Sequence, residues 1–407
     1  MMTLDNYLAE KLDILKADGR YRDFAVIECD ADFPDVTLRR GQFYGRATVW
    51  CANNYLGLAQ STMVKGAAMN VLNDYSSGAG GTRNIAGTRD WHDRVEQQLA
   101  QMNNKPAALL FTSGYVANWA TLATLGRHLP QCIFLSDEKN HNSIIEGIRA
   151  AGCGKVIFKH NDMDDLRDKI KHLPANATKI IVTEGLFSMD GDSPALADMV
   201  QIAKDYGALT YVDEVHAVGI YGARGSGIAE QQGVADEIDI VQGTLGKALA
   251  SMGGYVAASR LMIDFIRSHA NGFIFTTSLP PVLLAAASAA INWVMNNADA
   301  RHDYLKQVKK FQERLWHAGL IPHRGQTHLS LVPINNPHHC NQVAHMLLER
   351  GVYVQPINYP TVPKGAERFR ITLTPRHTRD HETHLIDELS ALTRRCPVFN
   401  HTAQIKA

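Results

Sequence analysis

The sequence predicts an α/β fold, in which a mostly parallel, seven-stranded sheet is flanked by helices and followed by a smaller α+β domain. Short apolar runs recur through the middle of the chain, and segments of helical length separate most of them. Strands that alternate with helices form a mostly parallel sheet with helices on both faces. The seven runs are AALLF (107–111), CIFL (132–135), KVIF (155–158), KIIVT (179–183), LTYVD (209–213), DIVQ (239–242) and GYVAA (254–258).

Two of the intervening segments are clear helix candidates, YVANWATLATLGRH (115–128) and LADMVQIAKDYG (196–207). GYVAA follows its predecessor closely, so an antiparallel edge strand is an alternative for it.

At the start of the chain, leucines spaced along one face predict a helix over residues 3–18 that Gly19 ends. A polar, irregular stretch is expected from there to TVWCANNYLG at 48–57.

The character of the sequence changes near residue 300. Leu305, Val308, Phe311 and Leu315 share one face of an amphipathic helix that Gly319 ends. We expect short strands near 329–334, 352–355 and 368–373 and a closing helix at 379–394. The predicted organisation is an N-terminal helix and arm (1–55), a large domain (56–297) and a small C-terminal domain (298–407).

The composition argues against several classes of partner. The 41 basic and 41 acidic side chains leave no charge excess that would suggest nucleic acid or an anionic membrane surface. The six cysteines are scattered without metal-ligand spacing, which predicts no metal site and suits a reducing compartment. Acidic residues at positions 5, 10 and 13 argue against a targeting peptide. We therefore expect a cytoplasmic protein.

Polar residues collect where the predicted strands end. Ligands of open α/β sheets bind beyond the carboxyl ends of the strands, so these residues predict one polar site. Grouped by the run that each set follows along the chain, they are Ser113, Gly114, Tyr115 and Asn118; Ser136, Asp137, Glu138, Asn140 and His141; Glu184 and Ser188; Asp213 and His216; Thr244 and Lys247.

An aromatic aldehyde phosphate fits this set of groups. Such a cofactor needs a lysine amine for covalent attachment, here Lys247, and a carboxylate beside its pyridinium nitrogen, here Asp213. It also needs a flat side chain over the ring, here His141, and hydroxyls and amides at a helix start for its phosphate. Alone, a lysine is usually a solvated surface group and a strand-end aspartate a helix cap. Their common position at successive strand ends favours the cofactor site.

The glycine-rich segment SSGAGGTRNIAGT (76–88) has a different meaning. It contains GxGG, but no strand run precedes it and it lacks the ending of a nucleotide-binding P-loop. A dinucleotide site is therefore weakly supported. The glycines instead favour a close approach of the backbone to a bulky substrate.

Two motifs resemble a known family. DEVHAVGIYGARGSG (213–227) and GTLGKALA (243–250) are similar to the α-oxoamine synthases, which are fold-type I pyridoxal-phosphate enzymes. Members condense a small amino acid with an acyl-coenzyme A and lose carbon dioxide. The resemblance runs from about residue 5 to 395 and is strongest to members that join glycine to succinyl-coenzyme A. Four further segments carry it: GRYRDF (19–24), SGAGGTRNIAGT (77–88), FIFTTSLPP (273–281) and VQPINYPTVPKGAERFRIT (354–372).

The resemblance implies a pyridoxal 5'-phosphate site and a homodimer with active sites at the subunit interface. It makes Lys247, Asp213, His141 and His216 the catalytic residues, with His216 and Ser188 at the ring substituents. It implies that the phosphate is held by Ser113, Gly114, Tyr115 and Thr244, and by Thr276 and Thr277 of the neighbouring subunit.

The resemblance also implies the substrate contacts. Arg370, helped by Asn53, would bind the glycine carboxylate, and Arg22 and Thr82 would recognise the carboxylate at the end of the succinyl group. The other positions that match acyl-coenzyme A contacts are Asn84, Ile85, Ser136, Lys155 and Thr361.

The sequence leaves rival functions open. Sister enzymes use glycine with acetyl-coenzyme A, alanine with pimeloyl-coenzyme A, or serine with a long acyl chain. Two rivals of a different kind are a catalytically inactive scaffold subunit and an aminotransferase. Ala248-Leu249-Ala250-Ser251 departs from the Phe and Gly that often follow the lysine, which changes packing but removes no catalytic group. Cys396-Pro397 resembles a haem-regulatory pair, although the end of a helix explains it better. The sequence also leaves open whether the product of the enzyme feeds tetrapyrroles such as haem or a specialised metabolite.

Overall fold

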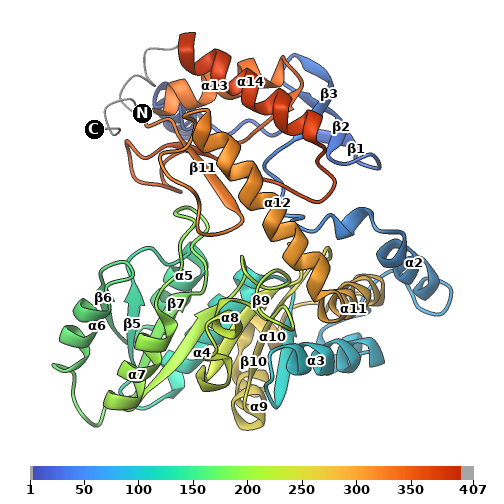
Figure 1. The fold of residues 1–407 in the computed structure, drawn as a ribbon. Coiled ribbons are helices and arrows are strands. Elements are labelled where there is room, and N and C mark those ends of the chain that lie inside the picture. Colours follow the sequence, from blue (N-terminus) through green and yellow to red (C-terminus); the bar gives the residue numbers. More distant parts are fainter. Residues whose placement is uncertain (1–2, 396–407) are drawn as a thin grey trace. The chain divides into compact units, whose positions relative to one another are not determined.

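The computed structural model describes residues 3–395 and divides into two compact units (Figure 1). The larger unit contains Leu56–Phe187 and Asp192–His302. The smaller unit contains the chain up to Tyr55, the short segment Ser188–Gly191, and the chain from Asp303 onward. The division into three domains stays a prediction, and Cys396-Pro397 lies outside the described residues.

A seven-stranded sheet forms the centre of the larger unit, in the order β4-β10-β9-β8-β7-β5-β6. β10 is antiparallel to both of its neighbours, whereas the other paired strands are parallel. The predicted α/β fold is confirmed, although GYVAA is an inner strand of the sheet instead of an edge. The strands are β4 (Ala107–Phe111), β5 (Ile133–Asp137), β6 (Gly154–Phe158), β7 (Lys179–Glu184), β8 (Ala208–Asp213), β9 (Ile240–Thr244) and β10 (Gly254–Ala258).

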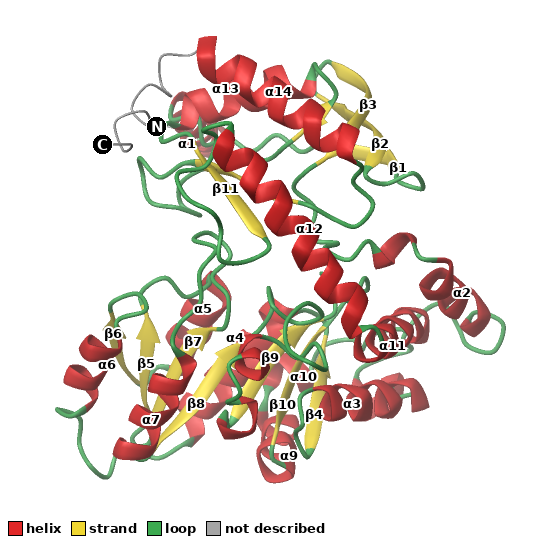
Figure 2. Cartoon of the chain, in the orientation of Figure 1, coloured by secondary structure: helices red, strands yellow, loops and turns green. Residues whose placement is uncertain are grey.

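Helices cover both faces of this sheet, for example α7 on one and α4 on the other (Figure 2). The helices that begin in the larger unit are α2 (Thr62–Val71), α3 (Asp90–Met102), α4 (Gly114–His128), α5 (Asn142–Ala151), α6 (Met163–Ile170), α7 (Leu196–Tyr206), α8 (Ile228–Gln231), α9 (Arg260–His269), α10 (Asn271–Ile274), α11 (Pro281–Asn296) and α12 (Ala298–His317). Short turns of other helix types are η1 (Leu58–Gln60), η2 (Arg83–Gly87) and η3 (Ala235–Glu237). Within the described chain, no helix combines the length and apolar composition needed to cross a bilayer.

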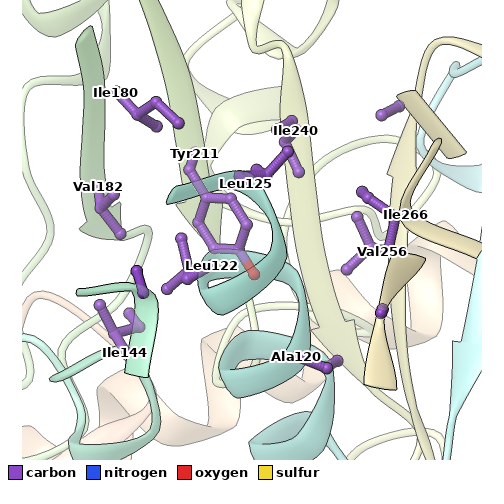
Figure 3. Packing of buried hydrophobic residues seen from close by; sticks show 14 of the residues in the cluster. Ala120, Leu122, Leu125, Ile144, Ile180, Val182, Tyr211, Ile240, Val256 and Ile266 are labelled. Atoms are coloured by element: carbon purple, nitrogen blue, oxygen red, sulfur yellow. The ribbon is translucent and has the colours of Figure 1, made fainter. Parts of the chain in front are cut away.

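The apolar core of the larger unit lies between the sheet and α4. Leu122 and Leu125 of α4 pack beside Tyr211 of β8, and all three are fully buried (Figure 3). α4 also packs closely against α5, because Gly126 has no side chain: a Cβ there would lie 2.5 Å from Cβ of Ala151. This contact joins the last turns of the two helices.

The smaller unit contains two further sheets. The stretch from Gly19 to residue 48 was expected to be irregular, but three strands form within residues 26–49, so that expectation was wrong. The first sheet has the order β1-β2-β3-β12 and the second β11-β14-β13. The elements are α1 (Leu4–Ala17), β1 (Val26–Cys29), β2 (Asp35–Arg40), β3 (Phe43–Val49), β11 (Leu329–Pro333), α13 (Pro337–Leu348), β12 (Val352–Tyr353), β13 (Pro356–Ile357), β14 (Arg368–Thr372) and α14 (Arg379–Arg395).

The N-terminal helix α1 forms where predicted but its apolar face is not covered by the described chain. Leu4, Leu8 and Leu12 are 70%, 49% and 46% exposed, and no residue of α1 is buried. The amphipathic helix α12, in contrast, buries Val308, Phe311 and Leu315. The leucine face of α1 is therefore available to another surface.

Two glycine substitutions in helices test the close packing of α4 and α5. We expect Gly126→Ala to lower the free energy of unfolding by about 1–3 kcal/mol, because the added methyl group overlaps Ala151. Gly66→Ala in α2 is the matched control, since its Cβ would meet nothing within 4 Å. It should raise stability by about 0.5–1 kcal/mol through helix propensity. Denaturant unfolding measures both, and equal effects would contradict this packing.

Candidate active site

The carboxyl ends of β4, β9, β8, β7 and β5 meet at one edge of the sheet. Parallel pairing places the ends of β5, β7, β8 and β9 together, and β4 runs in the same direction because β10 is antiparallel to both β4 and β9. The structure therefore brings together the strand-end residues of the larger unit that the sequence singled out, whereas Ser188 belongs to the smaller unit.

Asp213, the last residue of β8, is a buried carboxylate that is only 3% exposed. Its Oδ1 accepts the backbone N–H of Val215 at 2.8 Å, and its Oδ2 accepts Asn118 Nδ2 at 2.6 Å. Burial raises the pKa of Asp213 above its usual range, although both hydrogen bonds oppose that shift. A cation bound beside this carboxylate would favour its ionised form.

Lys247 lies in the turn that follows β9, with its Nζ 2.8 Å from Nε2 of His216. The turn is held by Thr244, whose Oγ1 donates to the Gly253 carbonyl at 2.9 Å and accepts the Gly246 N–H at 3.1 Å. An amine and an imidazole in hydrogen-bond contact can pass or share a proton. This pair is the candidate acid–base centre.

His141 is the N-cap residue of α5 and is anchored from two sides. Its backbone N–H donates to Oε1 of the buried Glu184 at 2.7 Å, and its ring Nδ1 lies 2.8 Å from Ser143 Oγ. Desolvation lowers the pKa of His141, which favours the neutral ring. The residue as a whole is exposed, and its flat ring lies at the edge of the sheet where the strand-end residues gather.

The start of α4 provides a place for an anion. Ser113 caps this 15-residue helix by accepting the Val116 N–H at 3.1 Å, and the N–H groups of the first turn point out of the helix. Gly254, the first residue of β10, lets this strand approach the start of α4, because a Cβ at Gly254 would lie 2.4 Å from the Ser113 carbonyl carbon. Tyr115 is 43% exposed and donates its hydroxyl to Asn142 Oδ1 at 3.0 Å.

Together these residues fit pyridoxal phosphate. The larger unit provides an amine, a buried carboxylate, an open flat ring and a helix N-terminus at one edge of one sheet. These are the four groups that the cofactor requires. In the described residues, no group of three or more His, Cys, Asp or Glu side chains forms a metal site.

The glycine-rich loop forms a second group with the residues after α10. Thr82 pairs with Thr277 in an isolated bridge, and Ser278 Oγ donates to the Gly87 carbonyl at 2.7 Å. Thr82 Oγ1 also donates to Asn84 Oδ1 at 2.6 Å. Thr276, Ile85, Ser136 and Lys155 belong to the larger unit too; Ile85 is 80% exposed and Ser136 is 2% exposed.

Five of the predicted site residues belong to the smaller unit. Two of them are in contact, since Arg370 donates a guanidinium N–H to Asn53 Oδ1 at 2.9 Å. Arg22 and Thr361 are exposed, and Ser188 is buried. Arg370 and Asn53 thus offer a cation and an amide that can bind a small carboxylate.

Sequence reasoning missed a charged cluster beside the site. His160, just after β6, lies 3.0 Å from Asp137 Oδ1 through Nδ1 and 3.1 Å from Asp192 Oδ2 through Nε2. Burial lowers the pKa of His160, but the hydrogen bonds and charges of both carboxylates outweigh it and raise the pKa to about 9. His160 therefore joins β5 to the segment that follows β7. The only sequence signal was a histidine two residues after an apolar run.

Comparisons with known proteins identify the family of the chain. A family model for aminotransferases of class I and II matches residues 46–389. A high-resolution structure of SPT with PLP covers 97% of this chain and 98% of its own, with a TM-score of 0.88 and 28% identity. A serine palmitoyltransferase of Sphingomonas wittichii gives a TM-score of 0.88, 27% identity, and coverage of 96% and 97%.

The chain belongs to the class I and II aminotransferase family, a class of pyridoxal-phosphate enzymes, and within it to the 5-aminolevulinate synthases. The 5-aminolevulinate synthase of Rhizobium meliloti (strain 1021) is 45% identical over 405 residues, which cover 99% of this chain and 100% of that protein. The resemblance to α-oxoamine synthases and the assignment of the cofactor are thereby confirmed.

The pH dependence of stability tests the His160 cluster. Because the folded state raises the pKa of His160 from 6.5 to about 9, its contribution is complete below pH 6.5 and is lost as the pH rises through 9. From pH 6.5 to 10 the native protein should lose about 2–3 kcal/mol more stability than His160→Asn, at 1.36 kcal/mol per pKa unit.

Denaturant unfolding at several pH values measures this difference. His345→Asn is the control, because His345 has a 67% exposed side chain and should follow the native curve. Parallel curves for the native protein and His160→Asn would show that the two carboxylates do not hold a charged imidazole.

Proposed function

We propose that this chain joins glycine to succinyl-coenzyme A and releases 5-aminolevulinate, coenzyme A and carbon dioxide. The observation that carries the proposal is the pairing of Lys247 with His216 at the sheet edge where Asp213 is buried. The near full-length relatives named for this activity support it.

Pyridoxal 5'-phosphate, when bound, withdraws electrons from the α-carbon of an attached amino acid and so eases loss of a proton or carboxylate there. We assign Lys247 to its covalent attachment, Asp213 to its ring nitrogen and His141 to its ring face. Ser188 and His216 would contact the ring substituents. The phosphate would be held by Ser113, Gly114, Tyr115 and Thr244, with Thr276 and Thr277 of the neighbouring subunit.

Lys247 is the base that removes the α-proton of glycine and later returns one. His216 supports this role because its Nε2 lies 2.8 Å from Nζ and can exchange a proton with the amine. The imidazole can also donate to an oxygen on which negative charge develops when the thioester is attacked. Both groups lie on turns that backbone hydrogen bonds hold, so they need little reorganisation.

Substrate recognition is assigned to charged groups. Arg370, held by Asn53, would bind the glycine carboxylate through a charge-assisted hydrogen bond. Arg22 and Thr82 would bind the terminal carboxylate of succinyl-coenzyme A, which acetyl-coenzyme A lacks. The remaining acyl-coenzyme A contacts in this proposal are Asn84, Ile85, Ser136, Lys155 and Thr361.

A homodimer with active sites at its interface is part of the proposal. Exposed apolar side chains support it, among them Ile85 at 80% and Phe275 at 77%. The bridge between Thr82 and Thr277 joins the glycine-rich loop to the threonines assigned to the neighbouring site. We also propose a cytoplasmic location, which the free cysteines of the described chain support.

Replacement of the attachment lysine gives the first test. Lys247→Ala should abolish the visible absorption band of the bound cofactor and lower kcat by at least about 10²–10⁴-fold, the usual contribution of a positioned base. Lys309→Ala, an exposed lysine of α12, should leave both unchanged. Normal turnover by Lys247→Ala would remove the basis of the assignment.

Acyl selectivity gives the second test. The native enzyme should use succinyl-coenzyme A with a higher kcat/KM than acetyl-, pimeloyl- or palmitoyl-coenzyme A when thiol release is followed with glycine present. Arg22→Leu should raise KM for succinyl-coenzyme A by about 10–100-fold, from the loss of a charged hydrogen bond, and leave acetyl-coenzyme A unaffected.

Arg46→Leu is the matched control, because Arg46 is an exposed arginine of the same unit with a 67% exposed side chain. It should behave as the native enzyme does. A higher kcat/KM for acetyl-coenzyme A in the native enzyme would favour glycine C-acetyltransferase activity instead.

A further inference from the structure

A buried hydrogen-bond chain connects the carboxylate of Asp213 to the ring of His141. Tyr211 donates its hydroxyl to Asn118 Oδ1 at 2.7 Å, and Asn118 Nδ2 donates to Asp213 Oδ2 at 2.6 Å and to Ser143 Oγ at 2.9 Å. Ser143 Oγ in turn lies 2.8 Å from His141 Nδ1. Tyr211, Asn118 and Ser143 are 0%, 1% and 1% exposed, so water does not compete for these bonds.

The positions of the hydrogens follow from the partners. An amide has two N–H hydrogens and a carbonyl oxygen, and in Asn118 the hydrogens go to Asp213 and Ser143 while the oxygen accepts from Tyr211. The flipped amide would place its oxygen 2.6 Å from a carboxylate oxygen, which is repulsive.

The direction of the last bond sets the tautomer of the histidine. Ser143 Oγ accepts from Asn118, so its single hydrogen is free to point at His141 Nδ1, which also accepts the Ser143 backbone N–H at 3.2 Å. A ring nitrogen that accepts two hydrogen bonds carries no proton. The proton of the neutral imidazole is therefore on Nε2, the only ring nitrogen that can donate.

The fold brings the members of this chain together from three elements. Tyr211 precedes Asp213 by two residues on β8, so their side chains lie on the same face of the sheet. Asn118 lies in the first turns of α4, and Ser143 is the second residue of α5. α5 approaches α4 closely at Gly147, where a Cβ would lie 3.1 Å from the Asn118 carbonyl oxygen. Figure 3 shows the Tyr211 ring with its hydroxyl among the residues packed against α4.

We propose that Tyr211, Asn118 and Ser143 are positioning residues that fix Asp213 and His141 relative to one another and hold His141 as the neutral tautomer with its proton on Nε2. The inference rests on the proposed function, in which Asp213 and His141 contact the ring nitrogen and the ring face of the cofactor. Asn118 then acts on both groups: it stabilises the charge of Asp213 directly, and through Ser143 it fixes His141 as a donor from Nε2. None of the three residues needs to touch the cofactor.

The test is a set of substitutions along the chain in the holoenzyme. Tyr211→Phe removes only the outermost hydroxyl and should lower kcat/KM for glycine by about 3–10-fold, the effect of one hydrogen bond. Asn118→Leu removes the centre and should lower it by about 100-fold, because a buried carboxylate loses a partner. Cofactor affinity should also begin to fall at a higher pH on acidification. The reason is that the lost hydrogen bond raises the pKa of Asp213, so the carboxylate becomes protonated at a higher pH.

Matched controls separate positioning from packing. Thr121→Val lies one turn further along α4, at a 0% exposed residue whose hydroxyl has no partner in the described structure. Tyr255→Phe repeats the tyrosine substitution at another fully buried site, where the hydroxyl contacts Asn103 Nδ2 at 3.3 Å. Both should leave the cofactor affinity and its pH dependence unchanged.

Nitrogen NMR of the holoenzyme with ¹⁵N-labelled histidine reads the tautomer directly, with His141→Asn used to assign the signal. A protonated Nε2 and a bare Nδ1 are expected, and Ser143→Ala should shift protonation toward Nδ1. A protonated Nδ1 in the native protein, or Tyr211→Phe and Asn118→Leu variants that match the controls in cofactor affinity and its pH dependence, would overturn the proposal. Native holoenzyme that binds the cofactor but does not convert glycine would instead count against the proposed function, because the tautomer is measured without turnover.

Discussion

The structure depends on a carboxylate, that of Asp213, which is buried away from water and held by two hydrogen bonds. A buried, unpaired carboxylate costs several kcal/mol, so Asp213 needs partners on every side. The Val215 N–H and the Asn118 amide supply two, and a cationic ring nitrogen would supply a third. An ionised Asp213 is best balanced by a positive group beside it, and in the proposed function that group is the protonated nitrogen of the cofactor ring.

The sheet makes this arrangement possible. Because five adjacent strands are parallel and β10 restores the direction of β4, polar residues that are distant in sequence emerge at one edge. Apolar packing of α4 on the sheet then fixes the helix start and Asn118 together. Stability and function are joined here, since the same helix contributes core leucines, the N-terminus that the proposed function assigns to the phosphate, and the partner of the carboxylate.

Much of this could be predicted from sequence, because buried parallel strands are continuous apolar runs whose ends differ from the structure by at most two residues. The strands of residues 26–49 were missed because they are short and mix apolar with charged and polar residues, so that no apolar run reveals them. α13 was missed although Asn336 and Pro337 give an N-terminal signal. The chain from Tyr211 to His141 could not be foreseen, because Asn118 lies 95 residues from Asp213 and 25 from Ser143. No spacing rule connects such positions before the fold is known.

The most direct test of the central claim locates the cofactor in the chain. The holoenzyme would be treated with borohydride, which makes the link between cofactor and lysine permanent, then digested and analysed by mass spectrometry. The phosphopyridoxyl mass should appear on the peptide that contains Lys247 and on no other. A label on a different lysine, or a bound cofactor that leaves every lysine unmodified, would contradict the site described here.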